Sequence, residues 1–221
     1  MAKIDSEIRT KETTIFNHSG NKITTVDKEI EIIAKFDEPL VIVLGSVLDD
    51  EECDALIQLS KDRLERSKTG SSREVSDIRT SSGVFLTDTN NEIVLQIEKR
   101  LASIIDIPID HGEGLHILNY LPGQEYKAHF DYFASTSKAA SNNRIATFVL
   151  YLNDVEEGGQ TYFPNLNLSV FPKKGMAVYF EYFYNYVQLN ELTLHGGAPV
   201  TQGEKWIATQ WIRRQKISKN I

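Results

Sequence analysis

The sequence predicts an α+β fold that is mainly β, in which two helices support a strand-rich C-terminal half. From residue 114 onward, short segments rich in Val, Ile, Tyr, Phe and Thr follow one another, among them LHILNYL, RIATFVLYL, MAVYFEYFY and KWIATQWI. Turn-forming pairs such as Gly158-Gly159 separate them, and strands at this spacing are typical of a β-sandwich or barrel. Two apolar patterns with helical periodicity precede this half.

One apolar strand and the two helices are predicted before residue 113. PLVIVLGSVL, residues 39 to 48, has the continuous apolar character of a buried strand. DDEECDALIQLSKDRLERS follows, with Asp49 or Asp50 as N-cap, acidic residues in its first turn and an apolar face formed by Leu56, Ile57 and Leu59. NNEIVLQIEKRLASIID predicts a second helix, capped by Asn90 or Asn91, with an apolar face formed by Ile93, Ile97, Leu101 and Ile104.

The chain is predicted to form a single domain, because no internal repeat, low-complexity block or Pro/Gly-rich linker divides its 221 residues. Residues 1–38 form an N-terminal region in which NKITTVDKEIEIIAKF could add strands beside the core. Residues 39–112 hold the strand and the supporting helices, and residues 113–216 form the β-core. A hydrophobic content of 41% is enough for a sizeable core.

Composition and charge exclude several classes of partner. The net charge is −7 with acidic and basic residues interspersed, so no basic stripe is available for nucleic acid. No run approaches the roughly 18 apolar residues of a membrane helix, and the start MAKIDSEIRTKE lacks an apolar signal core, which predicts a cytoplasmic protein without membrane contact. The single cysteine, Cys53, excludes an internal disulfide and a thiolate metal cluster, and it fits a reducing compartment.

Two small, polar segments could close over a site. SKTGSSREVSDIRTSSG, between the helices, is as long as an active-site lid, although a disordered surface loop fits it equally well. ASTSKAASNN follows the stretch YKAHFDYF. We expect SKTGSSREVSD and ASTSKAASNN to order over a bound peptide, with Arg79 as structural support for the first of them.

The stretch YKAHFDYF contains the first sign of chemistry. Residues i and i+2 of a strand face the same side, so His129 and Asp131 project together and could act as one chelate. A bare His-x-Asp often arises by chance as a surface or hydrogen-bonded pair. His195, in LTLHGGAP, lies in a late β-segment, and two histidines with one carboxylate form the facial triad that leaves positions open on non-haem Fe(II). Lys205, ten residues later, begins an apolar strand, where a buried ammonium needs an anionic partner such as a dicarboxylate co-substrate.

At these residues the chain resembles a known family. YLPGQEYKAHFDYF, RIATFVLYLNDVEEGGQTYFP, KKGMAVYF and LHGGAPVTQGEKWIATQWI are similar, in this order, to the catalytic domain of the prolyl 4-hydroxylases, which are Fe(II)- and 2-oxoglutarate-dependent dioxygenases. The resemblance spans roughly residues 79 to 213, and small bacterial members are nearest in size. It implies that the core is a double-stranded β-helix, or jelly roll.

The resemblance also implies roles for single residues. It assigns iron to His129, Asp131 and His195, and the distal carboxylate of 2-oxoglutarate to Lys205. Tyr120 and Thr161 match positions that offer hydroxyl groups to that carboxylate. The positions that line the peptide groove near the target proline are matched by Tyr126, Arg144 and Trp211. Other interpretations stay open for four of these five residues: Tyr120 and Trp211 suit core aromatics, Thr161 a strand residue and Arg144 a surface charge.

The activity that the resemblance implies is hydroxylation of peptidyl proline at C4. Fe(II), 2-oxoglutarate and O2 are the implied cofactor and co-substrates, succinate and CO2 the products, and ascorbate (vitamin C) the suggested reductant. The implied partner is a proline-rich or collagen-like peptide, and a homodimer is compatible with the N-terminal strands. The separate peptide-binding domain, paired cysteines and export signal of the animal collagen enzymes are not seen, so collagen in a secretory compartment is not the expected substrate.

Two alternatives to this activity are compatible with the same residues. The same chemistry could act on a free amino acid, another small molecule or a different protein side chain. The chain could also be a non-catalytic jelly-roll module that binds peptides. Intact His129, Asp131, His195 and Lys205 argue against the second alternative, because a binding module gains nothing from keeping all four.

Overall fold

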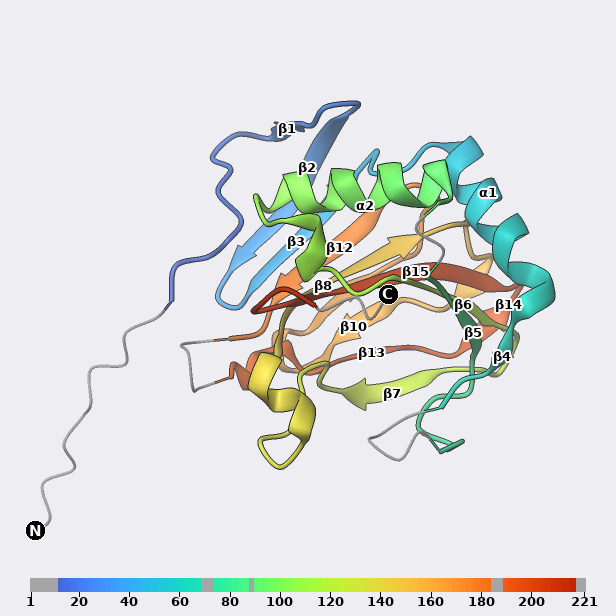
Figure 1. Cartoon of the computed structure of the whole chain (residues 1–221). Coiled ribbons are helices and arrows are strands. Elements are labelled where there is room, and N and C mark those ends of the chain that lie inside the picture. Colours follow the sequence, from blue (N-terminus) through green and yellow to red (C-terminus); the bar gives the residue numbers. More distant parts are fainter. Residues whose placement is uncertain (1–11, 69–73, 88–89, 184–188, 218–221) are drawn as a thin grey trace, which may run out of the picture.

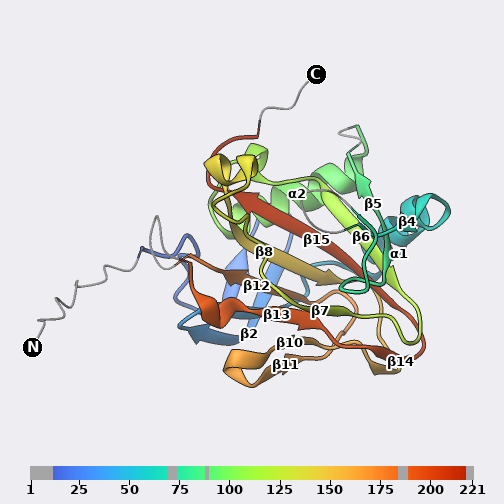
Figure 2. The same cartoon turned by 90° about the horizontal axis from the view of Figure 1, so that it is seen from below.

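Two antiparallel sheets face each other in the computed structural model, which describes residues 12–68, 74–87, 90–183 and 189–217 (Figures 1 and 2). From edge to edge, the larger sheet contains β1 (Lys22–Thr24), β2 (Glu29–Asp37), β3 (Leu40–Gly45), β12 (Ala177–Glu181), β8 (Arg144–Tyr151), β15 (Lys205–Arg213), β6 (Leu115–Tyr120), β5 (Ser82–Leu86) and β4 (Glu65–Arg66). The smaller sheet contains β11 (Leu168–Val170), β10 (Thr161–Phe163), β13 (His195–Gly197) and β7 (Tyr126–His129).

The remaining elements are short or lie outside the two sheets. A separate ribbon pairs β14 (Val200–Gln202) with β9 (Glu157–Gly158). The helices are α1 (Asp50–Ser60) and α2 (Glu92–Ile104), and α2 lies across the face of the larger sheet that points away from the smaller one (Figure 1). The 3-10 helices are η1 (Lys61–Arg63), η2 (Ile109–His111), η3 (Lys138–Asn142), η4 (Pro164–Leu166) and η5 (Glu191–Thr193). The predicted jelly roll with supporting helices is confirmed.

The central strands of the larger sheet are buried on both faces, as β8 shows. Phe148 and Leu150 belong to the apolar layer between this sheet and the helices. Val149 and Tyr151 alternate with them and belong to the layer between the two sheets. Because successive side chains of a strand point to opposite faces, a strand between two layers reads as a continuous apolar run. The one polar side chain inside this run, Thr147, is also fully buried.

Both helices begin at side-chain caps that the sequence predicted. Asp49 accepts a hydrogen bond from the backbone N–H of Glu52, and the Glu52 side chain accepts one from the backbone of Asp49, which is a complete capping box. Asn91 caps α2 by accepting from the backbone of Val94. The apolar faces of both helices pack on the outer layer of the larger sheet. α1 ends at Ser60, so the end of the predicted helical segment forms η1 and β4 instead.

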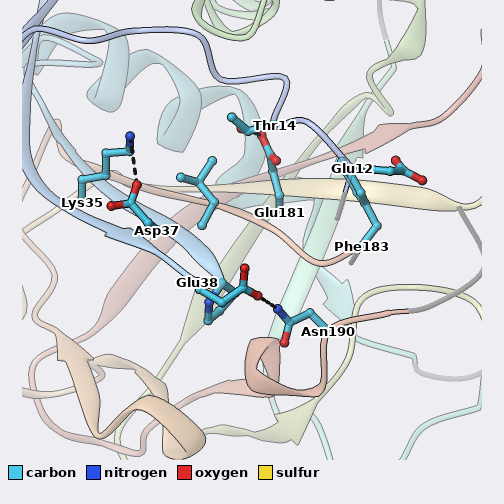
Figure 3. Close-up of a pocket in the computed structure, with 10 residues that line it drawn as sticks. Glu12, Thr14, Lys35, Asp37, Glu38, Glu181, Phe183 and Asn190 are labelled. Atoms are coloured by element: carbon cyan, nitrogen blue, oxygen red, sulfur yellow. Dashed lines mark hydrogen bonds and ion pairs between the residues drawn. The ribbon is translucent and has the colours of Figure 1, made fainter. Parts of the chain in front are cut away.

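The strands of the N-terminal region join the larger sheet directly, with β2 paired to β3 along its length. A buried carboxylate fixes the chain before them: Glu181 Oε1 accepts hydrogen bonds from Thr14 Oγ1 at 2.7 Å, from the backbone N–H of Phe16 at 3.2 Å and from Tyr179 Oη at 2.8 Å. Burial raises the pKa of Glu181. A cavity of about 280 Å³ lies beside this anchor, and its lining includes the carboxylates of Glu12, Asp37, Glu38 and Glu181 (Figure 3).

Of the two predicted mobile segments, the structure describes the second completely and the first only in part. Of SKTGSSREVSD, residues 69–73 lie outside the described residues, so its prediction as a lid is not tested there. ASTSKAASNN contains the short helix η3, whose first turn is capped by Ser137 through the backbone N–H of Ala139. Among the described residues, no helix is both long and apolar enough to cross a membrane.

Candidate active site

The pairing of β7 with β13 brings the three predicted metal ligands together. His129 ends β7 and lies opposite His195, the first residue of β13. Asp131 follows two residues after His129, and one ligand atom from each of the three residues lies within 4.8 Å of the others. Asp131 and His195 are buried, and His129 is largely so. The residues that the sequence placed on one strand and on a distant β-segment therefore share one site.

Backbone carbonyls fix the tautomer of both histidines. Nδ1 of His129 lies 2.9 Å from the carbonyl oxygen of Lys127, and Nδ1 of His195 lies 3.0 Å from that of Thr193. A carbonyl oxygen only accepts, so each Nδ1 carries the hydrogen and each Nε2 of the neutral ring presents a lone pair. Burial, together with the neighbouring His195, lowers the pKa of His129 and favours the neutral ring.

The carboxylate of Asp131 is held between these two nitrogens. Its Oδ1 lies 3.3 Å from Nε2 of His129, and its Oδ2 lies 3.4 Å from Nε2 of His195. The Thr147 hydroxyl donates a 2.7 Å hydrogen bond to Oδ2 and orients the group. Burial alone would raise the pKa of Asp131, but positive charge on the neighbouring histidines holds it well below its ordinary value, so the carboxylate is ionised next to a cation.

This arrangement suits a divalent cation. Two imidazole lone pairs face an ionised carboxylate, so three acceptors converge where a cation would bind them all. Two nitrogens and one carboxylate oxygen form the donor set that holds non-haem Fe(II) and leaves further coordination positions open. The residues therefore fit iron, with His129 Nε2, His195 Nε2 and a carboxylate oxygen of Asp131 as the atoms that would hold it.

Lys205 lies in the same cavity as these three residues. It is 3% exposed, and no acidic side chain among the described residues pairs with it. Burial lowers the pKa of Lys205 to about 7. Its Nζ lies 5.5 Å from the ring centroid of Tyr120, which pairs with it across β6 and β15. A buried ammonium that faces a cavity beside the Thr161 and Tyr120 hydroxyls fits the distal carboxylate of 2-oxoglutarate.

Two glycines allow the backbone to pass close to this cavity. A Cβ on Gly196 would lie 2.6 Å from the ring of Tyr162 and 2.8 Å from the carbonyl oxygen of Tyr126. A Cβ on Gly197 would lie 3.6 Å from Lys205 Nζ, in van der Waals contact with it. Side chains at these positions would therefore displace β13 from β7 or narrow the cavity.

The three predicted groove residues surround the metal ligands. The ring of Tyr126 stacks on that of His129 with 3.5 Å between centroids. The guanidinium of Arg144 lies 3.8 Å from the ring centroid of Trp211 and donates to both carboxylate oxygens of Glu113, at 2.7 and 2.8 Å. Trp211 Nε1 is buried without a hydrogen-bond partner among the described residues, so it is available to a ligand.

The sequence did not point to Thr147, Tyr151 or Glu113 as parts of the site or its support, and it gave Arg79 only a supporting role in the loop. The Thr147 hydroxyl donates a hydrogen bond to Asp131, and the Tyr151 hydroxyl donates one to Thr161. The Glu113 carboxylate accepts hydrogen bonds from the Arg144 guanidinium. Arg79 lines the cavity, with its guanidinium 4.8 Å from the ring centroid of Tyr126, rather than supporting the loop alone. Thr147 and Tyr151 could have been found from RIATFVLY, because they lie four residues apart in a doubly buried strand, so their polar atoms share one face and require partners there.

Comparison with known proteins agrees with this geometry. Residues 115–213 match the 2OG-Fe(II) oxygenase superfamily. The chain is 38% identical to prolyl 4-hydroxylase 5 of Arabidopsis thaliana over 229 residues, which cover 92% of this chain and 76% of that protein. It is 40% identical to prolyl 4-hydroxylase 1 of the same plant over 201 residues, which cover 81% and 71%.

Solved structures show the same architecture. The viral collagen prolyl hydroxylase of Paramecium bursaria Chlorella virus-1, in a 2OG complex, superposes with a TM-score of 0.65 at 32% identity and covers 78% of this chain and 95% of that one. A Pseudomonas putida prolyl-4-hydroxylase superposes with a TM-score of 0.57 at 19% identity, which shows a shared fold, and covers 79% and 92%.

Proposed function

The chain belongs to the prolyl 4-hydroxylase family of the 2OG-Fe(II) oxygenase superfamily, and we propose that it oxidises C4 of proline residues within extended, proline-rich or collagen-like peptides. It is an Fe(II)- and 2-oxoglutarate-dependent dioxygenase that hydroxylates proline. The observation that carries the proposal is one cavity that contains both the His129, Asp131 and His195 cluster and the buried ammonium of Lys205.

The bound iron, 2-oxoglutarate and dioxygen supply the oxidising chemistry: one oxygen atom enters succinate as CO2 is released, and the other enters proline. The protein positions these reactants and excludes water. His129 and His195 keep their Nε2 lone pairs turned to the metal position because the carbonyls of Lys127 and Thr193 hold the opposite nitrogens. Lys205 fixes the far end of the co-substrate, and so directs its 2-oxo acid end toward the metal position.

The residues around Trp211 support a peptide as substrate. Trp211 Nε1 and the Arg144 guanidinium are donors that could bind the carbonyls of an extended chain, and the Tyr126 ring lines the same cavity as Trp211. A polyproline II segment leaves its carbonyls free of internal hydrogen bonds and loses little entropy on binding. The net charge of −7 favours neutral or basic segments over acidic ones.

Three further features belong to the proposal. A cytoplasmic location is supported by the single, free cysteine, Cys53. A homodimer is proposed through the strands of the N-terminal region, and ascorbate is proposed as the reductant that keeps the iron reduced, as the family resemblance suggests.

A single reconstitution tests the proposal. The protein is loaded anaerobically with Fe(II) and 2-oxoglutarate and then exposed to air with a proline-rich peptide, while succinate and the peptide mass are followed. A gain of one oxygen atom on proline supports the proposed substrate, and C4 is identified by amino-acid analysis. Succinate without peptide oxidation would contradict the peptide substrate, and absence of succinate would contradict the reaction itself.

A further inference from the structure

A pair of hydroxyl groups lies at the end of the cavity that contains Lys205. Thr161, the first residue of β10, lines this cavity. Tyr151, the last residue of β8, does not belong to the described lining of the cavity. Tyr151 is fully buried behind the threonine, and its Oη donates a 2.8 Å hydrogen bond to Thr161 Oγ1. The tyrosine hydroxyl therefore acts on the cavity through the threonine.

The direction of this hydrogen bond follows from the chemistry of the two groups. A phenol is more acidic than an aliphatic alcohol, so it is the better donor and the poorer acceptor. Tyr151 then occupies one lone pair of Thr161 Oγ1, and the single hydrogen of the threonine hydroxyl is left for another acceptor. Among the described residues, no second hydrogen-bond partner of Thr161 competes for it.

Thr161 lies opposite Gly197 across β10 and β13, and a Cβ on Gly197 would lie 3.6 Å from Lys205 Nζ, so the Thr161 hydroxyl and the Lys205 ammonium lie in the same part of the cavity. Both residues line the cavity, and both are nearly inaccessible to solvent, with exposures of 4% and 3%. A carboxylate accepts hydrogen bonds only, so it can use both donors at once. An uncharged end of the same length would leave both donors buried without partners, which is costly.

We propose that Tyr151 is a positioning residue that turns the Thr161 hydroxyl hydrogen toward the distal carboxylate of 2-oxoglutarate and thereby favours dicarboxylic over monocarboxylic 2-oxo acids. The inference rests on the proposed function for the identity of the co-substrate. The Tyr151 ring also lies 5.9 Å from Lys205 Nζ, and phenylalanine would keep that ring contact. Tyr151→Phe therefore removes the hydroxyl and leaves the packing around Lys205 in place.

The test measures co-substrate binding directly, with the full chain, by calorimetry under anaerobic conditions with Mn(II) in place of Fe(II). The ligands are 2-oxoglutarate and 2-oxopentanoate, which shares the 2-oxo acid end and the chain length but lacks the distal carboxylate. The variants are Tyr151→Phe, Thr161→Val, Thr161→Ser and the double variants of Tyr151→Phe with each threonine change. Tyr179→Phe is the matched control, because it also removes a buried tyrosine hydroxyl, one that donates to Glu181 away from the site.

Tyr151→Phe is expected to weaken 2-oxoglutarate binding by about two- to tenfold, the range for one hydrogen bond, and to leave 2-oxopentanoate binding unchanged. The same change is expected to have no further effect in the Thr161→Val background, because the hydroxyl that it orients is already absent. It should retain its effect in Thr161→Ser, which keeps that hydroxyl. In turnover assays, KM for 2-oxoglutarate should rise while kcat at saturation is preserved. Tyr179→Phe should leave the binding of both acids unchanged.

Three results would overturn the inference while the proposed function stands: 2-oxoglutarate binding unaffected by Tyr151→Phe, equal weakening of both acids, or a full effect of Tyr151→Phe on top of Thr161→Val. Failure of the unaltered protein to bind 2-oxoglutarate in the presence of metal would instead overturn the proposed function, and this inference with it. Thermal unfolding midpoints of all variants identify any loss of fold. Comparison of Thr161→Ser with and without Tyr151→Phe then shows whether the effect of Tyr151 on 2-oxoglutarate binding depends on the hydroxyl at position 161 or on packing alone.

Discussion

Binding of 2-oxoglutarate should weaken steeply above neutral pH because of Lys205. The ammonium has no acidic partner among the described residues, and burial lowers its pKa to about 7. Burial disfavours the charged form, so the free protein loses this proton at a pH where an exposed lysine keeps it. A bound carboxylate favours the ammonium, and binding at or above neutral pH must therefore take up a proton.

The size of the effect follows from the two protonation states. If only the ammonium form of Lys205 binds the distal carboxylate, the apparent dissociation constant is multiplied by about 2 at pH 7, about 11 at pH 8 and about 100 at pH 9. Proton uptake on binding should be about 0.5 at pH 7 and about 0.9 at pH 8. Binding should change little below pH 6, where the lysine is already protonated in the free protein.

Anaerobic calorimetry between pH 6 and pH 9, in pairs of buffers with different ionisation enthalpies, measures both quantities. 2-Oxopentanoate is the control, because it shares the metal-binding end and any titration of the metal ligands but does not reach Lys205. Lys205→Arg keeps its charge over this range, so its curve should run parallel to that of 2-oxopentanoate. A dissociation constant for 2-oxoglutarate that is flat from pH 7 to pH 9, or equal proton uptake for both acids, would refute the reasoning.

Further changes test the site and its support. His129→Ala or Asp131→Ala should abolish succinate formation while circular dichroism shows a preserved fold, and retained activity in both would contradict the metal assignment. Thr147→Val should weaken Fe(II) binding by about tenfold or more in a metal titration, because Asp131 loses the hydroxyl that orients it, and unchanged affinity would mean that packing alone holds the carboxylate. Gly196→Ala should lower the free energy of unfolding by about 1–3 kcal/mol in a denaturant titration, since the added Cβ would meet neighbouring atoms at 2.6 Å, and wild-type stability would show that β13 can shift. Cys53 should resist alkylation at pH 8 until the protein unfolds, because burial raises its pKa to about 12, and rapid labelling of the native protein would contradict that burial.

The strands and helices were predictable where local chemistry decides the structure. Asp49 and Asn91 sit at helix starts because their side chains accept from the first free backbone N–H groups, which is a property of a few neighbouring residues. His129 and Asp131 do share one site, although β7 ends at His129 and Asp131 lies in the bend that follows it rather than on the predicted strand. The roles of such residues could be proposed from the sequence, because the chemistry depends on their type and spacing.

Contacts between distant strands were not predictable in the same way. Arg79 reaches the cavity because the segment before β5 bridges to Tyr126, a pairing that no local pattern indicates. Glu113 belongs to no motif of the sequence, yet it binds the guanidiniums of Arg144 and Arg213. Such partners are set by the register of strands that lie far apart in the chain, so their identification requires the fold.

The two faces of β8 have different roles, and this division makes a site with several buried polar groups compatible with a stable core. Its outward side chains pack on the helix-covered layer, while its inward face carries Thr147 toward the carboxylate of Asp131 and Tyr151 toward the hydroxyl of Thr161. Each hydroxyl satisfies a buried acceptor and leaves the group in front of it with one defined orientation. Substitutions on the outward face should therefore change stability with little effect on ligand affinity. Removal of either inward hydroxyl should change ligand affinity with little effect on stability. The ring of Tyr151 or the methyl group of Thr147 can be kept in such a variant, while the ligand-binding group in front of it loses its orientation.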